Sequence, residues 1–67
     1  MDRIERKIFN DTLAAFQERY PKRNINMETE YGNEIVYVDG KPKFCITGHN
    51  LLHSLNRLCE SIEDELR

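Results

Sequence analysis

Two cysteines and two histidines lie close together in the sequence and raise the question of a metal site. Cys45, His49, His53 and Cys59 are separated by four, four and six residues. Zinc binds thiolates and imidazoles, but its ligands must converge on one tetrahedron. Cys45 is expected on the outer side of a strand, Cys59 in the apolar stripe of a helix, and His53 outside that stripe. We therefore expect no metal site and no Cys-His nucleophile, and we interpret Cys59 as a small hydrophobic residue.

A cluster of carboxylates lies near the end of the chain. Its members are Glu60, Glu63, Asp64 and Glu65. One interpretation is a frayed, solvated helix end, because the helix macrodipole disfavours negative charge at this position. The other is an acidic patch that docks on a basic protein surface, such as a nucleic-acid groove. Acid-base catalysis would need a cleft and a raised pKa, so we expect no enzyme activity and no cofactor.

The basic residues support a different function. The net charge is −2, and the one short basic stretch is Arg19-Tyr20-Pro21-Lys22-Arg23. Direct nucleic-acid binding requires a basic face that displaces counterions from phosphate, so it is the alternative function. In that alternative the phosphate-binding residues are Arg19, Lys22, Arg23, Lys41 and Lys43, with Tyr20 or Tyr31 as a stacking surface.

The length of the chain indicates one domain with a thin core. A chain of 67 residues removes only about 60% of its unfolded surface from water, and small domains often need a disulfide, a metal or a partner. The charged start M-D-R-I-E-R-K does not resemble a signal peptide, and no apolar run approaches the roughly 20 residues that span a bilayer. We expect a single α+β domain over residues 1–67 in a reduced, cytoplasmic protein that avoids membranes and forms a homodimer.

Two amphipathic helices flank the middle of the chain. From Asp2 to Tyr20 the apolar residues recur with helical spacing, and Pro21 ends the pattern. Asn50 suits the N-cap of a second helix. The apolar side of the first helix is Ile4, Ile8, Phe9, Leu13, Ala15, Phe16 and Tyr20, and that of the second is Leu51, Leu52, Leu55, Leu58, Cys59, Ile62 and Leu66.

Residues 34–47 predict a β-hairpin. Asp39-Gly40 suits a type I′ turn, and runs rich in β-branched and aromatic residues flank it. Uninterrupted pairing sets Val38 opposite Lys41 and Ile35 opposite Phe44. The core side is then Ile35, Tyr37, Phe44 and Ile46. The outer side is Val36, Val38, Lys41, Lys43 and Cys45, and its apolar members would meet a partner.

The segment N-I-N-M-E-T-E-Y, residues 24–31, predicts a further strand because polar and apolar residues alternate. A two-residue turn at Gly32-Asn33 would place its apolar side with Val36 and Val38, away from the expected core. A three-residue loop over 32–34 would send that side to the core, and we favour it because the alternative exposes much apolar surface. The resulting order is α-β-β-β-α, a three-stranded antiparallel sheet with both helices on one face.

This order is similar to that of double-stranded RNA-binding domains, and F-C-I-T-G-H-N-L-L-H-S-L-N-R-L resembles the corresponding passage of HicB-type antitoxins. The first resemblance implies phosphate contacts through a lysine cluster at the start of the last helix. This chain has His49, Asn50 and His53 there instead. Both resemblances therefore concern architecture, and one fold can host unrelated functions.

The function expected from these observations is that of a non-enzymatic protein-binding regulator or inhibitor. Small acidic chains of this kind are typical of phages and other mobile elements, and the expected target is a nucleic-acid-handling host protein. The expected partner-binding residues are Val36, Val38, Glu60, Glu63, Asp64 and Glu65. The alternatives are a nucleic-acid-binding module, similar to the double-stranded RNA-binding domain, and a structural subunit of an obligate oligomer.

Overall fold

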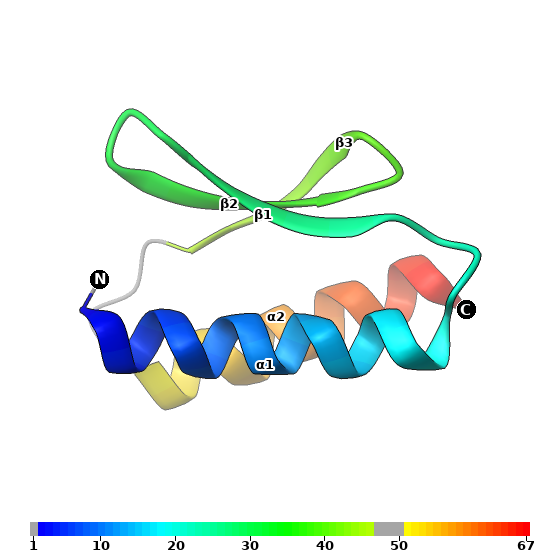
Figure 1. Cartoon of the computed structure of the whole chain (residues 1–67), viewed down its shortest axis with the longest axis horizontal. Helices are drawn as coiled ribbons and strands as arrows, with labels where there is room; N and C mark the ends of the chain where they lie inside the picture. Colours follow the sequence, from blue (N-terminus) through cyan, green and yellow to red (C-terminus); the bar gives the residue numbers. More distant parts are fainter. Residues whose placement is uncertain (1, 47–50) are drawn as a thin grey trace.

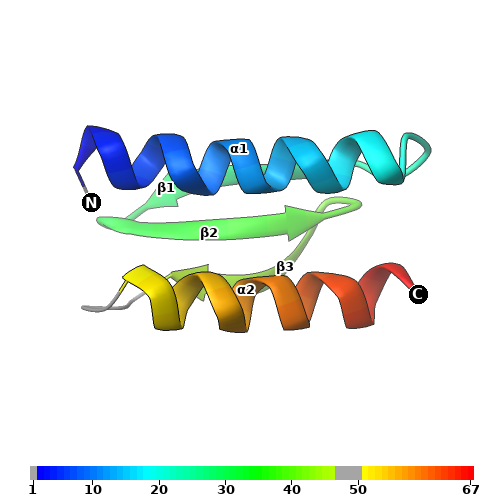
Figure 2. The same cartoon turned by 90° about the horizontal axis from the view of Figure 1, so that it is seen from below.

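A computed structural model describes residues 2–46 and 51–67 of the chain. Its elements are α1 (Arg3–Arg19), β1 (Ile25–Glu30), β2 (Asn33–Val38), β3 (Lys41–Ile46) and α2 (Leu51–Leu66). The strands form one antiparallel sheet in the order β1-β2-β3. Both helices lie on the same face of this sheet (Figure 1) and run side by side in the same direction (Figure 2). The predicted α+β class and element order are confirmed. The N-cap predicted at Asn50 lies outside the described residues.

The ends of α1 follow from local side-chain chemistry. Asp2 is the N-cap and forms a capping box with Glu5, whose backbone N–H donates to the Asp2 carboxylate at 2.8 Å. At the other end the Tyr20 N–H still donates to the Phe16 carbonyl at 3.0 Å. Pro21 follows and cannot continue the helix.

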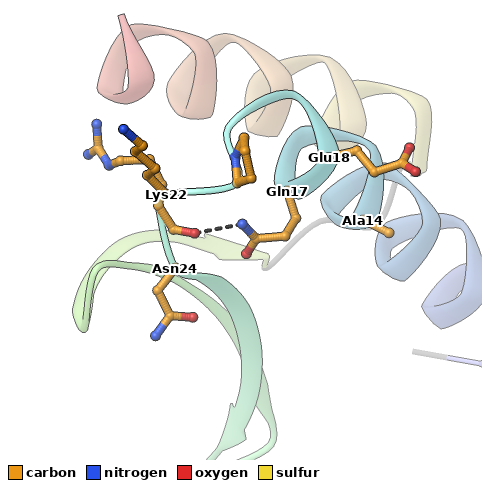
Figure 3. A pocket seen from close by; sticks show the side chains of 7 residues that line it. Ala14, Gln17, Glu18, Lys22 and Asn24 are labelled. Carbon is orange, nitrogen blue, oxygen red and sulfur yellow. Dashed lines mark hydrogen bonds between the residues drawn. The ribbon is translucent and has the colours of Figure 1, made fainter.

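Gln17 connects the end of α1 to the start of β1 (Figure 3). Its Nε2 donates to the carbonyls of Tyr20 at 3.1 Å and Arg23 at 2.6 Å, and its Oε1 accepts the Ile25 N–H at 3.0 Å. One amide side chain thus satisfies three backbone groups where the chain reverses direction. Sequence patterns gave no sign of this role.

The core lies between the helix layer and the sheet. Its buried apolar residues are Phe9, Leu13 and Phe16 of α1, Leu58, Ile62 and Leu66 of α2, and Ile25, Val36, Val38 and Ile46 of the strands. Three residues predicted for the apolar helix sides are exposed instead: Ile4 at 73%, Leu52 at 68%, and Ala15. Ile4 and Leu52 lie in the first turn of their helices, at the end of the helix layer.

Both hairpins close with a two-residue turn whose residues have positive φ. The turn predicted at Asp39-Gly40 is confirmed, with φ of 54° and 82°. The turn between β1 and β2 is Tyr31-Gly32, with φ of 52° and 80°, and Glu30 pairs with Asn33. The favoured loop over residues 32–34 is therefore wrong, and so is the alternative turn at Gly32-Asn33.

A β-bulge reverses the predicted faces of β2 but not those of β3, where Phe44 and Ile46 lie on the core side and Cys45 on the outer side as predicted. Val38 pairs with Lys41 as predicted, but the register shifts next to Tyr37, so Val36 pairs with Phe44 and Ile35 with Cys45. Because one extra residue in β3 changes the alternation, Phe44 joins Val36 on the helix side.

The placement of Val36 and Val38 on the outer side is wrong, because their exposed fractions are 0% and 1%. The outer side carries Ile35 and Tyr37, which were predicted for the core. Val36 and Val38 therefore cannot meet a partner in the folded chain.

Candidate functional site

One face of the sheet is bare of helices (Figure 1), and we call it the open face. By strand register it consists of Asn26, Glu28, Glu30, Asn33, Ile35, Tyr37, Pro42 and Cys45. Lys41 pairs with Val38 of the core side, and Lys43 reaches Glu65 of α2 at 3.3 Å. The open face, as these described strand residues define it, thus carries two carboxylates and no Lys or Arg.

An apolar centre and an acidic border make up the open face. Ile35 and Tyr37 are half-buried in its middle strand, whereas Cys45 of β3 and Glu28 of β1 are exposed. The Tyr37 hydroxyl donates to the Glu30 carboxylate. This hydrogen bond, with smaller contributions from desolvation and from the negative charges of Glu30 and Glu28, raises the pKa of Tyr37 to about 12.

The acidic cluster of α2 is divided into paired and unpaired carboxylates. Glu63 forms ion pairs with Arg19 at 3.7 Å and with Arg67 at 3.6 Å. Glu60 and Asp64 are exposed, and neither forms an ion pair with the part of the chain that the structure describes. Two of the four predicted carboxylates, Glu60 and Asp64, therefore remain available to a partner.

Three of the five predicted basic residues, Arg19, Arg23 and Lys43, form ion pairs with carboxylates at the same end of the molecule. Glu65 contacts Lys43 at 3.3 Å and Arg23 at 4.0 Å, and Arg23 also donates to Asp39 at 2.7 Å. The Arg19 guanidinium packs over the Tyr20 ring, 5.4 Å from its centroid. Glu63 and Glu65 of the leading function thus form a cluster of mixed charge with Arg19, Arg23 and Lys43 of the alternative.

Asp39 is a central acceptor of this cluster. The Asn24 backbone N–H donates to its carboxylate at 2.9 Å, and the Arg23 guanidinium donates to the other oxygen. These two hydrogen bonds, the first being the larger cause, lower the pKa of Asp39 below its ordinary value. The β2–β3 turn is thereby attached to the segment that leads into β1.

At the opposite end a buried carboxylate forms a site that the sequence analysis missed. The side chain of Glu34 is 7% exposed and faces the helices. It accepts hydrogen bonds from Arg6 at 2.5 and 3.4 Å and from the Thr29 hydroxyl at 2.9 Å to each oxygen. Buried charges require such partners, so this network serves the structure of the β1–β2 hairpin. No sequence pattern signalled this site, because Glu34 was expected in the loop over residues 32–34 and Arg6 lies 28 residues away.

A hollow of about 650 Å³ opens where α1 meets the following segment (Figure 3). Its lining residues are Ala14, Gln17, Glu18, Pro21, Lys22, Arg23 and Asn24. The Gln17 amide is already engaged by backbone groups, and Arg23 is engaged by Asp39. The remaining polar side chains, Glu18, Lys22 and Asn24, point in different directions (Figure 3), so they do not converge on one ligand.

The Cys/His set is dispersed as far as the structure describes it. Cys45 lies on the open face, and Cys59 packs against the core, where desolvation, followed by the charge of Glu63, raises its thiol pKa. Within residues 2–46 and 51–67 no three His, Cys, Asp or Glu side chains gather to hold a metal ion. His49 lies outside these ranges.

Comparison of the chain with family models, with curated proteins and with solved structures finds no match. Neither of the described helices is long and apolar enough to cross a membrane.

Proposed function

We propose that this chain is a non-enzymatic regulator or inhibitor that binds another protein through an acidic surface. The observation that carries the proposal is the open face, where two carboxylates border half-buried Ile35 and Tyr37 and the described residues of that face include no Lys or Arg. Exposed Glu60 and Asp64 of α2 add a second acidic area. Complementary charge favours a basic partner.

The partner class follows from this charge. Proteins that handle nucleic acids present basic surfaces to phosphate, and an array of carboxylates can occupy such a surface. We place the partner in this class and the protein in the cytoplasm. Buried Glu34 fits a binding protein better than an enzyme, because both its oxygens are already occupied by Arg6 and Thr29.

Affinity capture with matched baits tests the proposal. The baits are the intact chain, Glu28→Lys, the double variant Glu60→Lys/Asp64→Lys, and Glu18→Lys, a control at an exposed position of α1 that matches the charge change of Glu28→Lys. Glu63 is left unchanged because it is paired with Arg19 and Arg67. We expect a basic protein whose yield falls at least about tenfold with one or both acidic-surface variants and not with the control.

Equal capture by all four baits would contradict the proposal, provided that circular dichroism shows each variant folded. An electrophoretic shift assay at low salt tests the nucleic-acid alternative, since phosphate binding weakens steeply with salt. The pairing of Arg19, Arg23 and Lys43 with Glu63 and Glu65 gives this alternative less support, and we expect labelled RNA and DNA to remain unshifted.

A subunit of a homodimer or larger oligomer is the second candidate function. The half-buried residues Ile35 and Tyr37 on the open face favour it. Val36 and Val38, which were expected to meet a partner, are buried and do not support it. Light scattering over a range of concentrations measures the mass in solution. A monomer at every concentration would contradict the oligomer.

A further inference from the structure

The two edges of the sheet differ in how they are protected. β3 carries Pro42, which lacks an N–H, and the bulge next to it. Proline and bulges are the features that keep edge strands from pairing with other chains. β1 runs from Ile25 to Glu30 without a proline, and its pairing with β2 is regular over six residue pairs. β1 is therefore the edge at which another strand can add.

The backbone groups that point outward from β1 can be assigned from the pairing. The residues that flank a two-residue hairpin turn, here Glu30 and Asn33, form a hydrogen-bonded pair, and such pairs alternate along an antiparallel ladder. The N–H and C=O groups of Met27 and Thr29 therefore point away from β2. The outward N–H of Ile25 agrees with this assignment, because Gln17 accepts it. No described residue provides a partner for the outward groups of Met27 and Thr29.

A groove follows this edge on the helix side. It has a volume of about 320 Å³ between α1 and β1, and its lining includes Leu13 and Ala14 of α1 with Ile25 and Met27 of β1. On the other side of β1, Glu28 is exposed and Glu30 is half-buried. A strand added to β1 would thus place alternate side chains in an apolar groove and beside two carboxylates.

We infer that the β1 edge binds an extended segment of the partner protein in which basic and apolar residues alternate, by addition of that segment as a fourth strand. The inference rests on the proposed function and specifies its mode of contact. Main-chain hydrogen bonds to Met27 and Thr29 supply affinity, and the alternation of side chains supplies specificity. The apolar residues enter the groove beside Leu13, and the basic residues face Glu28.

The test uses an end-capped hexapeptide, Lys-Val-Lys-Val-Lys-Val, titrated into the isotope-labelled chain. We expect the amide signals of Met27 and Thr29 to shift and their hydrogen exchange to slow. Two further peptides carry N-methyl groups either on the valine or on the lysine nitrogens. If the peptide adds antiparallel to β1, its valine N–H groups point at β1. If it adds parallel, its lysine N–H groups do. In either case one methylated peptide should bind at least about tenfold more weakly than the other. Equal binding of both would overturn the inference.

Protein variants check the same contact. Met27→Pro removes one outward N–H, and Glu28→Lys reverses the adjacent charge, so each should weaken peptide binding by about tenfold or more. Glu18→Lys makes the same charge change at an exposed position of α1 that does not line the groove, and it should leave the affinity within about twofold. Equal effects of Glu28→Lys and Glu18→Lys would mean that binding depends only on net charge and would overturn the inference.

The outcomes separate this inference from the proposed function. If the peptide does not bind, but capture of the partner still falls with Glu28→Lys, strand addition is overturned and the acidic docking surface is retained. Light scattering that shows a dimer for the intact chain and a monomer for Met27→Pro would assign the edge to a second copy and likewise overturn the inference.

Discussion

The two hairpins of the sheet adopt the same turn with different residues. Asp39-Gly40 and Tyr31-Gly32 both have positive φ at each position, and the values agree within a few degrees. Aspartate tolerates this conformation, whereas a bulky aromatic residue is an outlier there. The β2–β3 turn is therefore favoured by its own sequence. The β1–β2 turn depends on what surrounds it.

The hairpins also differ in how they are attached to the rest of the chain. The β1–β2 hairpin is held by buried Glu34, which binds Arg6 of α1. The β2–β3 hairpin is held at its exposed turn, where Asp39 binds Arg23 and Asn24. The β1–β2 hairpin, whose turn is unfavourable, thus has the buried attachment. The β2–β3 hairpin, whose turn is favourable, has the exposed one.

The largest expected effect comes from removing half of the buried pair. Arg6→Ala leaves the Glu34 carboxylate without its cation, so we expect the free energy of unfolding to fall by about 2–3 kcal/mol, less than for a fully buried pair because Arg6 is 44% exposed. Lys7→Ala is the control, since Lys7 pairs with Asp11 between exposed side chains and should cost less than about 0.5 kcal/mol. Urea unfolding followed by circular dichroism measures both.

Replacing the whole pair should behave differently from breaking it. Arg6→Met combined with Glu34→Leu removes both charges and keeps apolar volume, so we expect a stability within about 1 kcal/mol of the parent or above it. A double variant as unstable as Arg6→Ala would show that the hydrogen bonds of this network, including that of Thr29, outweigh the cost of burying its charges.

Asp39→Asn examines the exposed attachment. Asparagine keeps the preference for positive φ, so the variant removes the charged acceptor of Arg23 and leaves the turn. The pKa of Asp39 is lowered in the fold from its ordinary value of 3.8, so its contribution is fully present above that value and is lost as pH falls through the lowered pKa. At neutral pH we expect Asp39→Asn to lower the free energy of unfolding, but by less than Arg6→Ala does. In acid the difference from the parent should vanish.

Unfolding curves of parent and Asp39→Asn at neutral pH and in strong acid provide the measurement. A difference that persists below the titration of Asp39 would mean that the lost charge is not the cause.

Tyr31→Asn should have a smaller effect of opposite sign. The Tyr31 side chain is fully exposed, so its replacement loses no packing, while relief of the left-handed conformation should stabilise the chain by about 1 kcal/mol. Asn33→Tyr is the control, because it adds an exposed ring to the same hairpin at a position outside the turn. If Tyr31→Asn were less stable than the parent, the Tyr31 ring would contribute more to stability than its left-handed conformation costs.

The sequence predicted those elements whose local signals agree with the fold. Pro21, the helical spacing of Phe9, Leu13 and Phe16, and the Asp39-Gly40 turn each act within a few residues, and they sufficed for the element order. The burial of Glu34 was invisible because its partner Arg6 lies 28 residues away. Polar side chains that satisfy distant groups leave no periodic signal.

The faces of β2 were predicted wrongly because one residue in β3 decides how the two strands align. The bulge in β3 shifts pairing by one position, and a shift of one reverses the side of every later residue. It allows Val36, Val38, Phe44 and Ile46 to share the core side. For the candidate site, the acidic cluster was visible in the sequence, but its pairing with Arg19, Arg23 and Lys43 required the three-dimensional arrangement.

The smallest expected effect on stability concerns a hydrogen bond across the first hairpin, on the open face. The Tyr37 hydroxyl donates to Glu30, and this bond raises the pKa of Tyr37 to about 12 from its ordinary value of 10. The fold thus favours the protonated phenol, so the contribution of this bond is complete below pH 10 and is lost as pH rises through about 12. The β2–β3 turn shows the opposite dependence, since Asp39 loses its contribution in acid.

Tyr37→Phe tests this contrast. The near-ultraviolet absorbance of tyrosinate should show a component of the parent titration near pH 12 that the variant lacks. At neutral pH the variant should unfold close to the parent, because the bond lies on a solvent-facing surface, where water replaces a lost partner. A parent chain whose three tyrosines all titrate near the ordinary value would mean that Glu30 does not hold the hydroxyl. In that case Glu30 would be free, with Glu28, to face a basic partner.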